Sequence, residues 1–293
     1  MLKRISKKKI LHHSAMRVAP VLARNFHNYY AQKVQNPIFL IGCFRSGTSL
    51  LSHLLGLHRD IAEWSEANEV LDPVWYPWRP ENQKRYPLEY DPYTFNDQWW
   101  ADMQSRQQEI RAKFGAYQSL RGKAYFLNKS PYNTFRLPQL LEIFPNARFI
   151  HIYRDGRAVA FSHAKKLTND NKLREWPEPE QTRFKESFDE LAIWMSGFWK
   201  QSLEEVEKQD EALGLTKQGL MMTLTYESLC ADSDSQLAQI CQFVGLDQTR
   251  FLPTLAKEKV IKQNHKWQEG LDKNAVSKMV AKMEPVLTQY NYL

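Results

Sequence analysis

The sequence contains little cysteine: three residues among 293, with no Cys-x-x-Cys pair. Because Cys43, Cys230 and Cys241 cannot all pair within one chain, we expect a reducing compartment and a cytoplasmic location. Histidines and cysteines nowhere share the spacing of a metal site, so we expect no bound metal.

Long hydrophobic runs are also missing. No stretch of about 18 apolar residues exists, which argues against a transmembrane helix. The amino terminus lacks the apolar core and the cleavage site of a secretory signal. The sequence shows no internal repeat and no motif that reads DNA or RNA, so nucleic acid is not an expected partner.

Acidic residues are absent before Asp60, whereas Met1 to Lys9 holds five lysines and arginines. We therefore treat residues 1–36 as a basic extension, in which basic and apolar residues alternate in a roughly helical pattern. Three interpretations stay open: a frayed or docking helix, a transit peptide, or an amphipathic helix in peripheral contact with an anionic membrane. The net charge of +7 favours anionic ligands or surfaces in general.

Apolar runs alternate with amphipathic segments along the rest of the chain. Strands are expected near residues 38–42, 125–128, 148–153 and 220–225, and helices near 48–57, 134–144, 156–166, 183–212, 234–244 and 273–288. This alternation predicts a parallel sheet flanked by helices. We expect one α/β domain over residues 37–293, with an aromatic-rich insertion at about 71–122.

The most informative segment is residues 37–51, where an apolar strand leads through a glycine-bounded turn into a helix. Gly42 and Gly47 have the spacing of a P-loop, G-x-x-x-x-G-K-[ST], which binds phosphate through backbone N–H groups and a helix amino terminus. The lysine that NTPases place on the β/γ-phosphates is replaced by Thr48, and the loop carries Arg45 instead. We expect a P-loop-like, three-layer domain that binds an anion but lacks the equipment for triphosphate chemistry.

Two later segments make the assignment more specific. The run 126–131 ends a short apolar stretch with Asn-Lys-Ser-Pro, and residues 146–162 form another strand, turn and helix, with Arg154 at the strand end and Ser162 eight residues later. In this order the three motifs resemble the sulfotransferases that use 3′-phosphoadenosine 5′-phosphosulfate (PAPS). The resemblance is closest to the tyrosylprotein-sulfotransferase-like and bacterial members, and it is clear over residues 37–70 and 124–165.

The resemblance implies roles for the matching residues in binding the donor. Arg154 and Ser162 would hold the 3′-phosphate. Tyr226 would lie near the adenosine, or would simply close the end of the sheet, and Lys266 would cover a donor phosphate, or would be an ordinary surface lysine. The 5′-phosphosulfate would be bound by the loop residues Arg45, Ser46, Gly47, Thr48 and Ser49.

The resemblance also implies the catalytic groups. Arg45 and Lys129 would stabilise charge that develops during transfer. A glutamate 21 residues after the loop arginine is the proposed base in the tyrosylprotein-like branch, and Glu66 occupies that position. Trp64 stands where a small residue is common, which departs from the pattern next to this base. His151 and His163 are the reserve candidates for accepting the proton.

The expected function is sulfuryl transfer from PAPS to a hydroxyl, with 3′-phosphoadenosine 5′-phosphate (PAP) as product. Nine aromatic residues between positions 75 and 100 suit the rings of a carbohydrate, so a glycan or glycolipid is favoured over a peptide tyrosine. A lid packed on its own aromatic residues is the alternative for this segment. The alternatives for the whole protein are a P-loop small-molecule kinase and a non-enzymatic nucleotide-binding module.

Overall fold

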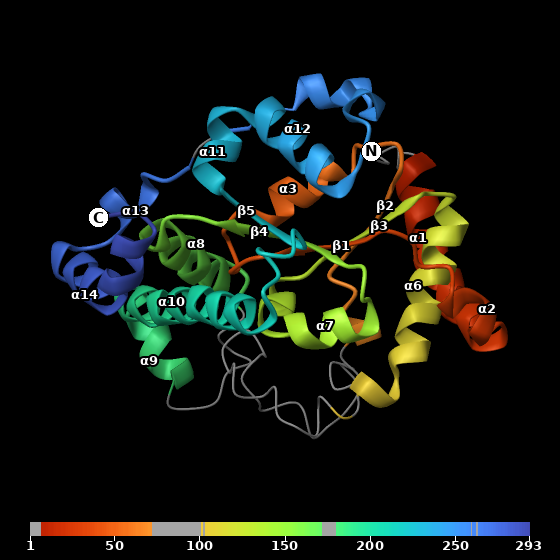
Figure 1. The fold of residues 1–293 in the computed structure, drawn as a ribbon. Helices are drawn as coiled ribbons and strands as arrows, with labels where there is room; N and C mark the ends of the chain where they lie inside the picture. The colour runs from red at the N-terminus through yellow and green to blue at the C-terminus, as the bar shows by residue number, and fades with distance from the viewer. Residues whose placement is uncertain (1–6, 72–100, 102, 172–179, 259, 262) are drawn as a thin grey trace, which may run out of the picture.

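A five-stranded parallel sheet with helices on both faces forms the centre of the computed structural model (Figure 1). The structure describes residues 7–71, 101, 103–171, 180–258, 260–261 and 263–293. The sheet order is β2-β3-β1-β4-β5, and all four neighbouring pairs are parallel. The strands are β1 (Pro37–Ile41), β2 (Ile61–Ser65), β3 (Tyr125–Lys129), β4 (Arg148–Tyr153) and β5 (Met221–Thr225). The prediction of a three-layer α/β domain is confirmed.

Alternating apolar side chains of the strands pack into two hydrophobic clusters, one on each face of the sheet. In β1, Ile38 and Leu40 join one cluster, whereas Phe39 and Ile41 join the cluster on the opposite face. The first face is covered by α3 (Thr48–Leu55), α11 (Tyr226–Ala231) and α12 (Ser233–Val244), which lie above the sheet in Figure 1. Because both faces are covered, β1 is buried along its whole length.

The opposite face carries the longer helices. They are α6 (Gln107–Arg121), α7 (Leu137–Ile143), α8 (Gly156–Asn169) and α10 (Phe188–Leu213). Helix α14 (Lys273–Gln289) packs on α10, and α1 (Lys7–Asn25) and α2 (His27–Ala31) pack on α6. Shorter elements complete the described part of the chain: α4 (Asn68–Leu71), α9 (Glu180–Glu186), α13 (Lys266–Gly270) and the 3₁₀ turns η4 (Pro131–Phe135), η6 (Gln248–Arg250) and η7 (Pro253–Lys257).

The structure differs from the predicted elements at several places. The sheet has a strand that the sequence did not reveal, β2, whose five residues include Glu63 and make no long apolar run. The expected helix 183–212 is two helices, because Ser187 accepts a hydrogen bond from the Glu190 backbone N–H and caps α10. The expected helix 134–144 begins as the turn η4, and Arg136 separates that turn from α7.

Part of the expected insertion belongs to the core. Helix α6 places Phe114 and Tyr117 against Trp64 of β2, with ring centroids 5.6 and 4.6 Å apart. A Cβ atom on Gly115 would lie 2.0 Å from the carbonyl oxygen of Tyr30, so α2 approaches α6 where the side chain is missing. The aromatic run at 75–100 lies outside the described residues.

Candidate active site

The loop between β1 and α3 forms a cradle of backbone N–H groups. Gly42 (φ +142°), Arg45 (φ +67°) and Gly47 (φ +98°) adopt positive φ, which gives the loop its tight turn. A Cβ on Gly42 would lie 2.2 Å from the carbonyl oxygen of Ile152 in β4. Gly47 is the N-cap of α3 and has no side chain to occupy the first-turn N–H groups, so they can bind an anion.

The predicted loop residues sit at different depths. Ser46 and Thr48 are buried, and the Ser46 hydroxyl has no hydrogen-bond partner among the described residues. Ser49, in the first turn of α3, lies within 3.4 Å of the Lys129 ammonium. Arg45 is the loop residue whose side chain reaches outward, and its Nε donates to the Ser162 hydroxyl over 3.1 Å. The first and third motifs therefore meet directly.

Arg154 follows β4 and ties three segments together. Its guanidinium donates to the carbonyl oxygen of Arg45 (3.1 Å), the carbonyl oxygen of Gln263 (2.5 Å) and the side-chain oxygen of Asn264 (2.8 Å). The guanidinium carbon lies 4.3 Å from the centre of the Tyr226 ring. Burial lowers the pKa of Arg154, but the ordinary value is so high that the side chain stays charged.

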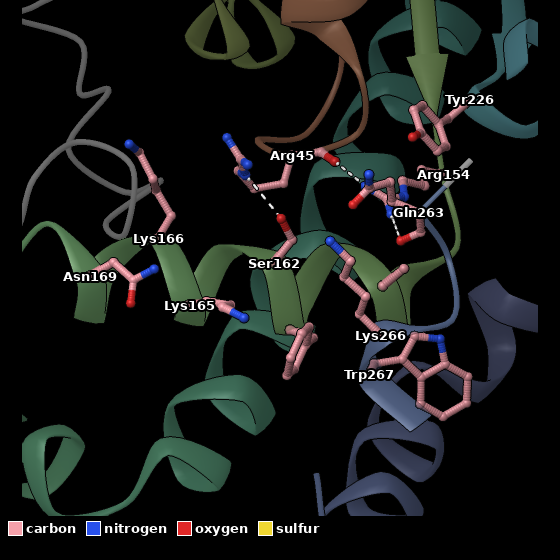
Figure 2. A pocket seen from close by; sticks show the side chains of 12 residues that line it. Arg45, Arg154, Ser162, Lys165, Lys166, Asn169, Tyr226, Gln263, Lys266 and Trp267 are labelled. Carbon is pink, nitrogen blue, oxygen red and sulfur yellow. Dashed lines mark hydrogen bonds between the residues drawn. The ribbon is translucent and has the colours of Figure 1, made fainter. Parts of the chain in front are cut away.

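A cavity of about 370 Å³ opens beside these residues (Figure 2). Five of the residues predicted to bind the donor line it, namely Arg45, Arg154, Ser162, Tyr226 and Lys266. In Figure 2 the Lys266 ammonium points toward the space between Ser162 and Arg154. The described lining carries five cationic side chains and no carboxylate, which suits an anionic ligand.

Sequence reasoning missed the remaining lining residues. On α8, Lys165, Lys166 and Asn169 lie three, four and seven positions after Ser162, so helical spacing from Ser162 would have found them. Trp267 directly follows the predicted Lys266 in a Lys-Trp pair, and that pair was the signal that could have found it, whereas no sequence signal marks Gln263. The other lining residues are Ala158 and Phe161.

The position of the Tyr226 ring accounts for the glycine at position 47 of the loop. Its ring lies so close to Gly47 that a Cβ there would be 2.6 Å from the tyrosine Cδ2. The hydroxyl donates to the carbonyl oxygen of Ile261 over 3.1 Å, and burial raises the pKa of Tyr226 to about 12. Tyr226 therefore both closes the end of β5 and lines the cavity.

The second cluster of predicted residues joins β2 and β3. Lys129, whose side chain is only 4% exposed, forms an ion pair with Glu66, whose side chain is 55% exposed. Glu66 has φ +52°, a left-handed conformation that is uncommon for a non-glycine residue. Its backbone N–H donates to the Lys129 carbonyl oxygen over 2.6 Å, which fixes the turn after β2. The carboxylate is thus held at the ammonium group yet remains open to solvent.

Asn128 positions this pair from the interior. Its side-chain amide donates to the Trp64 carbonyl oxygen over 2.8 Å and accepts from Asn133 over 2.7 Å. Trp64 itself is buried against α6, so its large side chain points into the core and not into the site. The departure from the family pattern at Trp64 therefore leaves the neighbouring Glu66 accessible.

The reserve histidines lack access to an acceptor. His151 is 2% exposed, and burial lowers its pKa to about 4. His163 is 3% exposed and stacks on Phe44, with ring centroids 5.4 Å apart. A general base must reach the proton that it removes, so burial argues against both residues as the base.

Three further observations concern the described residues. Cys43, Cys230 and Cys241 form no disulfide with one another, and burial raises the pKa of Cys43 to about 12. No cluster of histidine, cysteine and acidic side chains suited to a metal ion occurs in the described ranges. None of the described helices combines the length and apolar character needed to span a bilayer.

Comparison with known proteins defines the class. The Sulfotransferase family matches residues 37–250, so the chain belongs to this family, and the predicted resemblance is confirmed. The chain is 31% identical to the omega-hydroxy-beta-dihydromenaquinone-9 sulfotransferase Stf3 of Mycobacterium tuberculosis over 128 residues, 43% of this chain and 30% of that protein. It is also 31% identical to human protein-tyrosine sulfotransferase 1 over 127 residues, 43% of this chain and 33% of that protein.

The matched part spans about a third of the length of these relatives. Among solved structures, the sulfotransferase STF9 of Mycobacterium avium superimposes with a TM-score of 0.59 over 94% of this chain and 82% of that chain. The sequence identity is 16%, so this likeness supports the fold alone.

Proposed function

We propose that this protein transfers the sulfuryl group of PAPS to a hydroxyl acceptor. The observation that carries the proposal is the cavity lined by Arg45, Arg154, Ser162 and Lys266, which adjoins the glycine-bounded loop. A nucleotide with phosphates at the 3′ and 5′ positions of its ribose requires two neighbouring anion sites, and the Arg45–Ser162 hydrogen bond supports this assignment because it brings the first and third motifs together. Membership of the sulfotransferase family supports the same donor.

In the proposed reaction, the loop side binds the 5′-phosphosulfate. The unoccupied first-turn N–H groups of α3 and the Arg45 guanidinium would stabilise negative charge on the bridging oxygen as its bond to sulfur breaks. The Ser46 hydroxyl, buried without a partner among the described residues, fits a polar ligand in the loop. Arg154 has five N–H donors and uses three in the contacts described above, which leaves two for the 3′-phosphate.

Glu66 and Lys129 would act at the acceptor. The acceptor oxygen forms the new bond to sulfur while its proton passes to the Glu66 carboxylate, and PAP leaves. Lys129 would hold that carboxylate and stabilise charge on the transferring group, since its ammonium lies between Glu66 and Ser49. Because the Glu66 side chain is half exposed, an acceptor can approach it from solvent.

We propose a carbohydrate hydroxyl as the acceptor class, in a glycan or glycolipid. The nine aromatic residues between positions 75 and 100 support this choice, since aromatic faces suit sugar rings. The names of the two relatives point to a lipid quinone hydroxyl and a peptide tyrosine as competing acceptors. Three cysteines that form no disulfide with one another support a reducing compartment such as the cytoplasm.

Transfer of labelled sulfuryl from PAPS to a panel of carbohydrate, lipid and tyrosyl-peptide acceptors tests the proposal. We expect labelled product with a carbohydrate, without added metal, and a loss of about 10²–10³-fold in rate for Lys129→Ala. A matched control is Lys217→Ala, which removes an exposed lysine outside the cavity lining. Product with no acceptor class, although PAP binds, would contradict the proposed activity.

A further inference from the structure

Helices α1 and α2 present an exposed surface that the donor site does not use. We call it the α1–α2 face. Its apolar members are more than 40% exposed, and Leu11, Val21, Phe26 and Tyr29 are more than half exposed. The face consists of Leu11, Arg17, Val18, Val21, Arg24, Phe26 and Tyr29.

Contacts on the opposite side fix the orientation of this face. Ala15, Ala19 and Ala23 are buried in the core shared with α6, so the small side chains of α1 point inward. His12 Nδ1 lies 2.7 Å from the Tyr117 hydroxyl, and Arg111 donates to the carbonyl oxygen of Ala31 over 3.0 Å. The helices are therefore docked on the domain, and their outward residues form a fixed surface.

Basic and apolar residues alternate within that surface. Arg17, Val21 and Arg24 follow one another at helical spacings of four and three positions, and Leu11 and Val18 are seven positions apart. These spacings place both kinds of side chain on one side of α1. The Lys33 ammonium, two residues past the end of α2, lies 4.5 Å from the centre of the Tyr29 ring and extends the basic character beyond that helix.

The charged residues of the amino-terminal segment itself all have one sign. The first 36 residues contain eight lysines and arginines, and no aspartate or glutamate occurs before Asp60. A partner of this face must offer negative charge together with an apolar phase for the exposed aliphatic and aromatic side chains. Nucleic acid offers the negative charge but no apolar phase in which Leu11, Val18 and Val21 could be buried. A bilayer with anionic lipid headgroups offers both.

We propose that the α1–α2 face binds peripherally to an anionic membrane surface, with the apolar side chains at the level of the headgroups. The test is cosedimentation of the full chain with vesicles of phosphatidylcholine containing about one third phosphatidylglycerol. We expect binding at low salt and loss of binding to pure phosphatidylcholine vesicles. Screening at high salt should also weaken binding, because the charges are exposed.

Two double variants separate the contribution of the basic residues to vesicle binding from that of the apolar residues. Arg17→Gln/Arg24→Gln should weaken binding roughly 30-fold, since a basic residue near an anionic surface contributes about fivefold. Val21→Ser/Phe26→Ser should weaken it about tenfold or more, because apolar area no longer leaves water. The matched controls are Lys217→Gln/Lys273→Gln and Leu293→Ser, which remove exposed residues of the same kinds elsewhere. They should bind like the parent protein.

Circular dichroism and transfer activity without vesicles verify that each variant is folded, since none of these residues lines the donor cavity. Equal binding to neutral and anionic vesicles, or no binding to either, would overturn the proposal. If the arginine variant loses binding to the vesicles and Val21→Ser/Phe26→Ser does not, the apolar side chains do not enter the bilayer and the proposal is wrong.

Discussion

Replacing Arg154 by alanine should remove most of the preference for PAP over 5′-AMP, which lacks the 3′-phosphate. The two guanidinium N–H groups that make no protein contact can each donate a charge-assisted hydrogen bond, and such a bond contributes roughly 1.5–3 kcal/mol. Taking the lower value for each, the loss is about 3 kcal/mol, or roughly 150-fold in affinity for PAP. Affinity for 5′-AMP should change much less.

The same substitution should also lower stability, because Arg154 joins the loop, the 263–264 segment and Tyr226. Losing these contacts should cost a few kcal/mol, so binding is measured well below the melting temperature. Isothermal titration calorimetry with PAP and 5′-AMP gives the ratio of the two affinities directly.

Arg157→Ala is the matched control, since Arg157 lies three residues away, bonds Asp155 and the Tyr292 carbonyl oxygen, and does not line the cavity. An unchanged ratio in Arg154→Ala would refute the assignment of Arg154 to the 3′-phosphate.

Three further predictions follow from the site. Glu66→Gln should keep PAP affinity and slow transfer by about 10²–10⁴-fold, as removal of a positioned base does; turnover within about threefold of the parent would show that another group takes the proton. Gly47→Ala should weaken PAP binding and lower the melting temperature, because its Cβ would meet the Tyr226 ring at 2.6 Å and φ is +98°; calorimetry showing parent-like values would contradict the loop geometry. Burial disfavours the Cys43 thiolate and raises its pKa to about 12, so a thiol reagent at pH 8 should label Cys43 only after unfolding; rapid labelling in the native state would be inconsistent with this burial.

The parts of the fold that carry strong local patterns could be predicted from the sequence. β1 and β4 are apolar runs that end in turn residues, and each leads into a helix, so their place and direction follow from hydrophobic periodicity. The strand β2 was not predicted because its five residues include Glu63. The Glu63 carboxylate accepts hydrogen bonds from the hydroxyls of Ser52 in α3 and Ser65 in β2. A short strand of this kind is defined by its neighbour β3, with which it pairs over five residues.

The grouping of Arg45, Arg154 and Ser162 at one cavity could be predicted because these residues lie on sequence motifs. Arg45 and Arg154 each follow a strand, and β1 and β4 are neighbours in the sheet, so their side chains had to meet at the carboxyl ends. Gln263 and Asn264 could not be predicted in their positioning role. They act through a carbonyl oxygen and an amide of an irregular segment, and only the tertiary fold brings them to Arg154.

The roles of Glu66 and Lys129 are intermediate between these cases. Their positions were predicted from the family resemblance, but the ion pair depends on the register that sets Ser65 opposite Lys129. That register is held by Asn128 and by the packing of Trp64 on α6, a helix that the sequence pattern did not reveal. Composition and periodicity alone therefore could not have placed the carboxylate beside the ammonium group.

The central claim is that the cavity and the loop together bind a nucleotide with phosphates at its 3′ and 5′ positions. Thermal unfolding with PAP, compared with ATP and Mg²⁺ at the same concentration, tests this most directly, because a ligand that binds only the folded state raises the melting temperature. We predict a clear upward shift with PAP and little or no shift with ATP and Mg²⁺. A larger shift with ATP and Mg²⁺ than with PAP would contradict the account and favour a P-loop kinase.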